Sequence, residues 1–304
     1  FKWYLQGSNQ GHMDFQSIAL PSELRYLYQT RQYCLLIAGA NIEPILYFPK
    51  QLLKKINLYI CKTKNFDMLL TIDVGNSRIK VAVFEEDKLI ELFVFEHQEA
   101  LKKISEIVSF FPKISNAIYS SVGKLDVEVL ELIKSKVKIK IINHDSSFPF
   151  INKYATPNTL GIDRMVLSAG ATLKFPNQNR LIIDAGTCVT YDFIDKDNSY
   201  FGGAISPGIK LRYKSLHDYT AKLPLLTISS PSNFIGDSTN NSIHSGVING
   251  LCYEIDGFIS QYYLKYQDLT VILTGGDADF LAKRLKSTIF ANSNFLLESL
   301  NLLS

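Results

Sequence analysis

Two acidic residues stand at the ends of short apolar runs, and similar small, polar turns follow them. Asp73 precedes Val-Gly-Asn-Ser, and Asp184 precedes Ala-Gly-Thr. A carboxylate at the mouth of a buried strand costs free energy unless it is solvated, paired or bound to a cation. The small turn lets backbone N–H groups approach an anion closely. This combination is typical of a phosphate site with a metal ion. An ordinary hairpin whose Asp caps the turn explains the Asp73 stretch equally well.

The recurrence of this pattern indicates internal duplication. Asp184 stands 111 residues after Asp73, and each Asp-x-Gly turn precedes a predicted hairpin and then a helix. Acidic strand ends from two related halves would face one another across a cleft, where like charges repel unless a cation or a shared proton intervenes. Mg²⁺ with nucleotide phosphates suits such a pair of carboxylates. The absence of a Walker A sequence argues against a P-loop kinase.

A second group of residues, Gly161-Ile-Asp-Arg164, opens a helix predicted over residues 161–173. An acid in the first helical turn is favoured by the helix dipole, so capping is one explanation for Asp163. The functional alternative has Asp163 accept a proton from an attacking hydroxyl while Arg164 binds a carboxylate or phosphate. The residues alone leave these two explanations open.

Three further motifs carry weaker signals. The loop Gly202-Gly-Ala-Ile-Ser-Pro-Gly208 would let backbone approach a ligand, and Ser238 or Thr239 could cap a long helix predicted over residues 238–266. Thr274-Gly-Gly-Asp277 follows a predicted strand and fits either a nucleotide contact or a simple turn. The five histidines show no metal-ligand spacing, so they are given no role.

Composition excludes several classes of function. The chain has 304 residues, of which 46% are hydrophobic and 20% charged, as in a globular protein of one large or two medium domains. Four cysteines without close spacing indicate a reducing cytosol, hence a cytoplasmic protein. Residues 1–67 hold eight Lys or Arg and four Asp or Glu, while the rest hold 24 and 25. This near-neutral main body argues against nucleic acid as partner, and no apolar run is long enough to span a membrane.

The expected organisation has three parts. Residues 1–67, with possible helices at 21–33 and 52–60, carry no chemical motif and are predicted to be an N-terminal extension, either natural or a cloning product. Residues 68–160 and 161–304 are the two halves of the catalytic unit. The apolar periodicity predicts helices over 100–111, 127–133 and 208–219, and strands over 117–122 and 138–142.

The motifs at Asp73, Gly161, Asp184, Gly202 and Thr274, taken in this order, resemble the type III pantothenate kinase family over about residues 68–300. The resemblance implies a duplicated, ribonuclease-H-like α/β fold of the actin, sugar kinase and heat-shock ATPase class, with a central cleft. It also implies transfer of the ATP γ-phosphoryl group to pantothenate, the first step of coenzyme A synthesis, in a homodimer. The implied cofactors are Mg²⁺ with ATP and a monovalent cation, K⁺ or NH₄⁺.

The resemblance assigns roles to individual residues. Asp163 would be the general base, Asp184 would bind the monovalent cation, and Asp73 would bind Mg²⁺. The residues assigned to ATP are Asp73, Val74, Gly75, Asn76, Ser77, Arg78, Ile79, Lys80 and Thr187. The residues assigned to pantothenate are Tyr154, Gly161, Ile162, Asp163, Arg164 and Thr239, the last from the neighbouring subunit.

Two alternatives stay open. One is another small-molecule kinase of the same fold, acting on a sugar or a carboxylate, although Gly161-Ile-Asp-Arg164 matches the pantothenate family better. The other is a non-catalytic nucleotide-binding regulator on this scaffold. That alternative predicts loss of the acids, whereas Asp73, Asp163 and Asp184 are all present.

Overall fold

The computed structural model describes residues 67–75, 78–121 and 125–304. These residues belong to one compact unit, Asn65–Ser304. Residues 1–66 of the predicted extension, with its two expected helices, lie outside the described residues, as do Asn76 and Ser77. Within the described part of the chain, no helix combines the length and the apolar character needed to cross a membrane.

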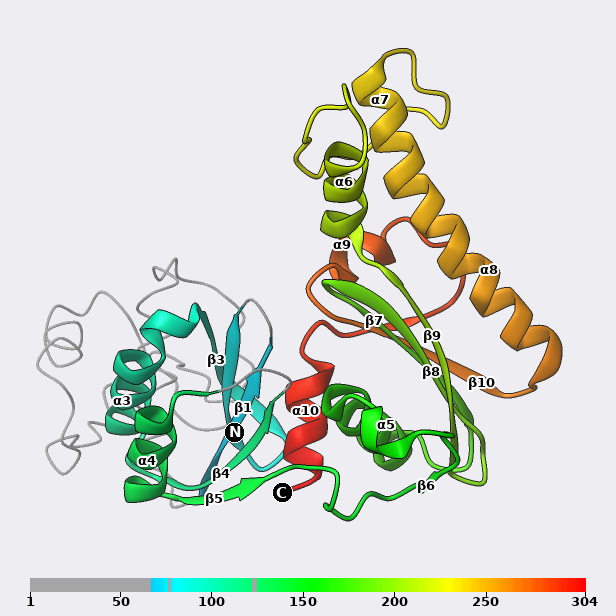
Figure 1. Ribbon diagram of the computed structural model, residues 1–304. Helices are drawn as coiled ribbons and strands as arrows, with labels where there is room; N and C mark the ends of the chain where they lie inside the picture. The colour runs from blue at the N-terminus through cyan, green and yellow to red at the C-terminus, as the bar shows by residue number, and fades with distance from the viewer. Residues whose placement is uncertain (1–66, 76–77, 122–124) are drawn as a thin grey trace, which may run out of the picture. The chain divides into compact units, whose positions relative to one another are not determined.

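The first half is built on a five-stranded sheet with the order β3-β2-β1-β4-β5 (Figure 1). Its strands are β1 (Met68–Val74), β2 (Ile79–Glu85), β3 (Lys88–Phe95), β4 (Ile114–Ser121) and β5 (Lys138–Ile141). The central strand β1 pairs antiparallel with β2 and parallel with β4. Helices α3 (Ala100–Phe110) and α4 (Val127–Lys136) pack against each other, and a short 3-10 turn, η2 (His97–Glu99), precedes α3.

The second half repeats this topology. Its sheet has the order β11-β10-β7-β8-β9-β6, so the central strand β7 again pairs antiparallel with the next strand and parallel with the one beyond the hairpin. The strands are β6 (Ile151–Asn152), β7 (Asn179–Ala185), β8 (Cys188–Ile194), β9 (Ser199–Pro207), β10 (Leu269–Thr274) and β11 (Phe290–Ala291). The order 3-2-1-4-5 therefore occurs in both sheets, which confirms the duplication predicted from the repeated motif.

Two helices join the halves. Helices α5 (Ile162–Lys174) and α10 (Phe295–Leu302) pack against each other between the two sheets (Figure 1). Helix α10 contacts β1, β2 and β4, while α5 contacts β4, β7 and β8. A single apolar cluster accordingly contains Ile118 of the first sheet, Val166 of α5, Ile182 of the second sheet and Leu300 of α10.

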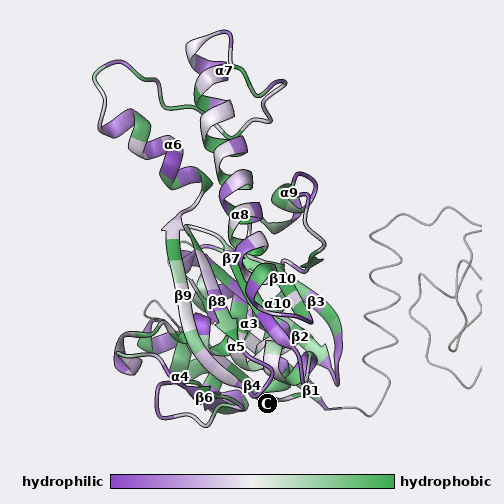
Figure 2. Ribbon diagram, turned by 90° about the vertical axis from the view of Figure 1, so that its right-hand side faces the viewer, coloured by the Kyte–Doolittle hydropathy of each residue, from purple (hydrophilic) through white to green (hydrophobic). Residues whose placement is uncertain are grey.

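The remaining helices follow strands of the second sheet. They are η3 (Pro157–Thr159), α6 (Ile209–Asp218), α7 (Thr239–His244), the π-helical turn η4 (Ser245–Asn249), α8 (Gly250–Lys265) and α9 (Ala278–Ala282). Stacked rings hold α8 and its C-cap residue Tyr266 on the sheet, with centroids 4.2 Å apart for both Tyr191–Phe258 and Phe193–Tyr266. In Figure 2, hydrophobic residues run through the strands of both sheets, and much of α6 is hydrophilic.

Most predicted elements are present, with differences at their ends. The long helix predicted over 238–266 is helical throughout but contains η4, and Ser238 caps it by accepting the Asn241 N–H at 3.3 Å. The short helix α9, which follows the Thr274-Gly-Gly-Asp277 motif, begins at Ala278 and ends at Ala282. Helix α10 was not predicted, because its short, largely apolar sequence shows little contrast between faces.

The contact between α5 and α10 gives a test of this packing. A Cβ added to Gly170 of α5 would lie 2.9 Å from the Ser299 Cα of α10, closer than packed atoms approach. We expect Gly170→Ala to lower the free energy of unfolding by about 1–3 kcal/mol through overpacking. Gly257→Ala in exposed α8, where nothing lies within 4 Å, is the matched control and should raise it by up to about 1 kcal/mol. Chemical denaturation measures both, and equal changes would contradict the close packing.

Candidate active site

Asp73 and Asp184 occupy equivalent positions in the two sheets. Asp73, near the end of β1, lies opposite Lys80 of β2 and Ser120 of β4. Asp184, near the end of β7, lies opposite Thr190 of β8 and Thr274 of β10. Both side chains are half-buried at the carboxyl ends of their strands, the end at which open α/β sheets bind ligands.

The turns after these acids are closed in the same way. The Gly75 N–H donates to the Arg78 carbonyl at 3.1 Å, and the Gly186 N–H donates to the Cys188 carbonyl at 2.9 Å. Thr187 is exposed in the second turn, and its carbonyl accepts the Gly208 N–H at 3.0 Å. The motif that ends at Gly208 therefore packs directly onto the second turn.

The other residues of the first turn differ in their access to a ligand. Val74 and Ile79 are fully buried strand residues, so their side chains belong to the core. Arg78 is exposed and Lys80 is half-buried. A ligand at this turn would therefore meet backbone groups and the Lys80 or Arg78 side chains.

The acids of the site influence one another electrostatically. The pKa of Asp73 is raised to about 7, mainly by burial; the charges of Asp184 and Asp163 add to this increase, and the Lys80 charge opposes it. Burial likewise raises the pKa of Asp184 to about 7, where Asp163 adds to the increase and Lys80 opposes it. Asp73, Asp163 and Asp184, from β1, α5 and β7, thus form one acidic site that Lys80 partly neutralises.

The same acids fit a cation that arrives with a nucleotide. No group of three or more His, Cys, Asp or Glu side chains among the described residues could hold a metal by itself. Mg²⁺ commonly keeps several waters and is bound through one or two carboxylates together with substrate phosphates. Asp73 and Asp184 offer carboxylates of that kind, and burial disfavours their charged form unless a positive charge lies nearby.

The turn after β10 completes the surroundings of Asp184. Gly275 has φ +94°, and a Cβ at this position would collide with the Asp184 Oδ1 and lie 2.6 Å from the Ala185 carbonyl carbon. The Asp277 N–H donates to the Ala185 carbonyl at 3.0 Å, and the Asp277 charge contributes to the raised pKa of Asp184. Thr274-Gly-Gly-Asp277 therefore packs against the Asp184 strand end.

Asp163 lies in the first turn of α5, beside the other two acids. Helix α5 begins at Ile162 with Gly161 as its N-cap, and the Asp163 Oδ1 accepts the Arg164 N–H at 2.8 Å. Burial raises the pKa of Asp163, this hydrogen bond lowers it, and the nearby Asp192 charge raises it. Asp163 therefore bonds to the helix terminus and is also a carboxylate with a raised pKa in the acidic site.

Arg164 is held by a partner that sequence reasoning missed. Its Nη2 and Nε donate to the Asp192 Oδ1 at 2.7 and 2.9 Å, and the Tyr200 hydroxyl donates to the same oxygen at 2.5 Å. Burial alone would lower the pKa of Arg164, but Asp192 outweighs this effect and raises it. The Tyr154 ring lies 5.7 Å from the Arg164 Cζ. In the sequence, only one feature pointed to Asp192: it is the single acid in the largely apolar run that forms β8.

Thr239 lies apart from this group. It is the exposed first residue of α7, and no interaction described in the structure joins it to Asp163 or Arg164. The structure therefore brings Tyr154, Asp163 and Arg164 together but places Thr239 on a separate helix.

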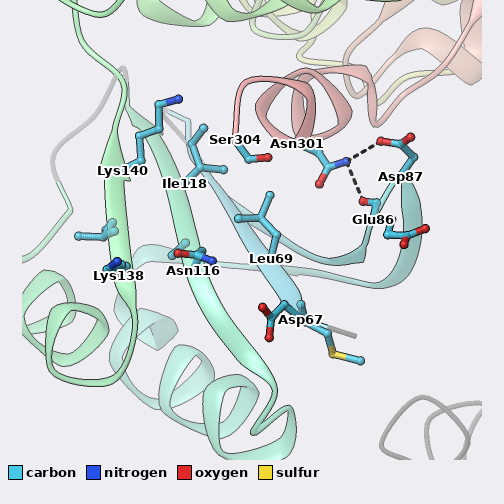
Figure 3. A pocket seen from close by; sticks show the side chains of 13 residues that line it. Asp67, Leu69, Glu86, Asp87, Asn116, Ile118, Lys138, Lys140, Asn301 and Ser304 are labelled. Carbon is cyan, nitrogen blue, oxygen red and sulfur yellow. Dashed lines mark hydrogen bonds between the residues drawn. The ribbon is translucent and has the colours of Figure 1, made fainter. Parts of the chain in front are cut away.

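A distinct pocket lies at the opposite end of β1. Its volume is about 650 Å³, and it is lined by residues such as Leu69, Asn116, Lys140 and Ser304 (Figure 3). The Asn301 side chain donates to the Glu86 carbonyl at its edge. None of the predicted site residues lines this pocket. The candidate active site is therefore defined by the acidic ends of β1 and β7 and by the charged side chains near them, and not by this pocket.

A duplicated sheet of this strand order, with an acidic turn at the end of each central strand, defines the actin-like class that includes sugar kinases. The model of the type III pantothenate kinase family matches residues 69–261. The chain belongs to the type III pantothenate kinase family.

Curated relatives are similar over most of the chain. The type III pantothenate kinase of Flavobacterium johnsoniae is 59% identical over 234 residues, which cover 77% of this chain and 96% of that protein. The enzyme of the same name from Flavobacterium psychrophilum is 58% identical, with 77% and 97% covered. Among solved structures, a ROK family glucokinase from Streptomyces griseus is 11% identical with a TM-score of 0.44, covering 78% of this chain and 99% of that one.

The buried pair of Arg164 and Asp192 predicts a large effect on stability. The two side chains are 8% and 0% exposed, so removal of one charge leaves the other buried without compensation. We expect Asp192→Ala to lower the free energy of unfolding by about 3–5 kcal/mol. Glu131→Ala, which removes the exposed pair with Lys134, should cost less than about 1 kcal/mol. Similar losses in both variants, measured by denaturant titration, would refute the importance of the buried pair.

The raised pKa values predict how stability depends on pH. Protonated Asp73 and Asp184 are favoured in the folded chain, so their contribution is full below about pH 4 and is lost as the pH rises through their folded-state pKa of about 7. Without nucleotide or divalent cations, the free energy of unfolding should fall across this range. Asp184→Asn should reduce the fall by a few kcal/mol, because it removes one of the two titrating groups and also a charge that raises the pKa of Asp73.

Denaturation at a series of pH values measures this effect. The matched control is Asp197→Asn, which changes an exposed acid in the turn between β8 and β9. An Asp184→Asn profile parallel to that of the unmodified chain would contradict the electrostatic description of the site.

Proposed function

We propose that Asp163 is the general base with which this chain phosphorylates pantothenate. The chain is a kinase that uses ATP to convert pantothenate to 4′-phosphopantothenate, the first step of coenzyme A biosynthesis, as its family membership establishes. The observation that supports the role of Asp163 is its place in the acidic site formed with Asp73 and Asp184.

Phosphoryl transfer depends mainly on how the reactants are positioned and on how their negative charge is neutralised. In phosphoryl transfer the protein does little covalent chemistry, and catalysis comes from positioning and electrostatic stabilisation. Asp163 would accept the proton of the primary hydroxyl of pantothenate as that oxygen attacks the γ-phosphorus. A base works best with a pKa near the working pH, and burial raises the pKa of Asp163 in that direction.

The nucleotide would lie against the turns that follow β1 and β7. Backbone N–H groups of the turn that starts at Gly75, together with Lys80 and Arg78, would bind phosphate oxygens, and Thr187 would contribute from the second turn. A kinase that uses ATP requires a divalent metal such as Mg²⁺, and Asp73 would hold it. When bound, the ion supplies positive charge to the transferring phosphoryl group.

Pantothenate would lie beside the start of α5. Gly161, Ile162 and Arg164 would line its site, and Tyr154 would contact it from the preceding loop. Because Asp192 and Tyr200 fix the Arg164 guanidinium, any contact with the substrate carboxylate would be made by an arginine that is already oriented. Such preorganisation lowers the cost of binding.

Three finer features belong to the same proposal. Asp184 would bind K⁺ or NH₄⁺, in keeping with its half-buried carboxylate.

The chain would act as a cytoplasmic homodimer in which Thr239 reaches the pantothenate site of the partner. Phe234 and Ile235, next to this helix, are 72% and 69% exposed, as expected of a surface that a partner covers. Sedimentation equilibrium measures this association.

An ATP-dependent pantothenate phosphorylation assay tests the proposal. The unmodified chain should phosphorylate pantothenate faster with K⁺ than without it. Asp163→Asn should reduce kcat by about 10²- to 10⁴-fold, the usual contribution of a general base, and leave ATP binding nearly intact. Asp145→Asn, in the exposed loop after β5, is the matched control and should keep full activity. Near-normal turnover by Asp163→Asn would contradict the assignment of Asp163 as the general base.

A further inference from the structure

His97 is bonded to the strand end that carries the first phosphate turn. It is the first residue of η2, half-buried, and its Nε2 lies 3.0 Å from the Gly75 carbonyl oxygen, although 22 residues separate the two. Because a carbonyl oxygen can only accept a hydrogen bond, the ring must donate through Nε2. The histidine is therefore a donor at a fixed place beside the turn.

The register of the first sheet explains how His97 reaches this carbonyl. Val74 of β1 lies opposite Ile79 of β2, and Ile79 lies opposite Phe95 of β3. The ends of three strands are therefore side by side, with Gly75 just beyond β1 and His97 two residues beyond β3. The Glu96 N–H donates to the Glu99 side chain at 3.2 Å, which fixes the turn that carries His97.

The bond controls the backbone where a phosphate would bind. The Gly75 N–H is used within the turn, where it donates to the Arg78 carbonyl. The bond from His97 holds the Gly75 carbonyl, the other polar group of this residue, so both backbone groups of Gly75 have a partner at the end of β1. A strand end that is already held in place lowers the cost of ordering the turn when an anion binds.

We propose that His97 is a positioning residue for the nucleotide, holding the Gly75 peptide so that the turn after β1 binds the phosphates. The inference rests on the proposed function, since it deepens the role given there to this turn. His97 itself does not touch the reacting groups. Its removal should therefore weaken nucleotide binding and leave the binding of pantothenate unchanged.

Steady-state kinetics with both substrates provide the test. For His97→Ala we expect the KM for ATP to rise about 3- to 10-fold, the range for loss of one hydrogen bond, with kcat and the KM for pantothenate within about twofold. His97→Gln, whose side-chain amide has similar reach, should restore most of the ATP KM. Calorimetric binding of a non-hydrolysable ATP analogue with Mg²⁺ should weaken by the same factor as the KM.

His144 supplies the matched control. Its Nε2 makes the same kind of bond, 2.9 Å to the Leu160 carbonyl, but next to the Gly161 motif. His144→Ala should leave the KM for ATP unchanged. An unchanged ATP KM in His97→Ala, an equal rise in the pantothenate KM, or the same ATP effect in His144→Ala would overturn the inference. Failure of the unmodified chain to phosphorylate pantothenate while it still binds the analogue would instead overturn the proposed function.

Discussion

Three carboxylates in one half-buried site impose the main constraint on this molecule. Burial and mutual repulsion raise the pKa of Asp73 and Asp184 to about 7, and Lys80 offsets only part of this effect. Such a site is costly in isolation, and its cost falls when cations bind. Under the proposed function, a nucleotide bound with Mg²⁺ at these acids would supply positive charge and offset this electrostatic cost.

The duplicated fold meets this constraint through a shared core. Each sheet contributes one acidic strand end, but the two ends act together only if the halves are held together. Helix α5 provides the third acid and packs with α10 between the sheets, so the same apolar cluster that joins the halves also fixes Asp163. Stability of this core and geometry of the site are therefore linked through one helix.

Much of this arrangement was predictable from local sequence. The repeat of Asp-x-Gly at 73 and 184 indicated two equivalent strand ends, and the topology confirms that their strands occupy the same place in each sheet. The roles of the individual site residues remain predictions. Contacts between distant segments were not predictable, since nothing near Arg164 in the sequence points to Asp192 or Tyr200. The role of His97 depends on the register of three strands, which single-sequence patterns do not specify.

Asp163 shows why capping and catalysis were hard to separate from sequence. An acid at a helix N-terminus is stabilised as an anion by backbone N–H groups, which lowers its pKa. In this chain the Arg164 N–H has that effect, while burial and Asp192 act in the opposite direction. The helix terminus keeps the carboxylate in place and the buried surroundings keep its pKa raised. A base needs both, so the hydrogen bond from the Arg164 N–H is part of what would make Asp163 suited to accept a proton.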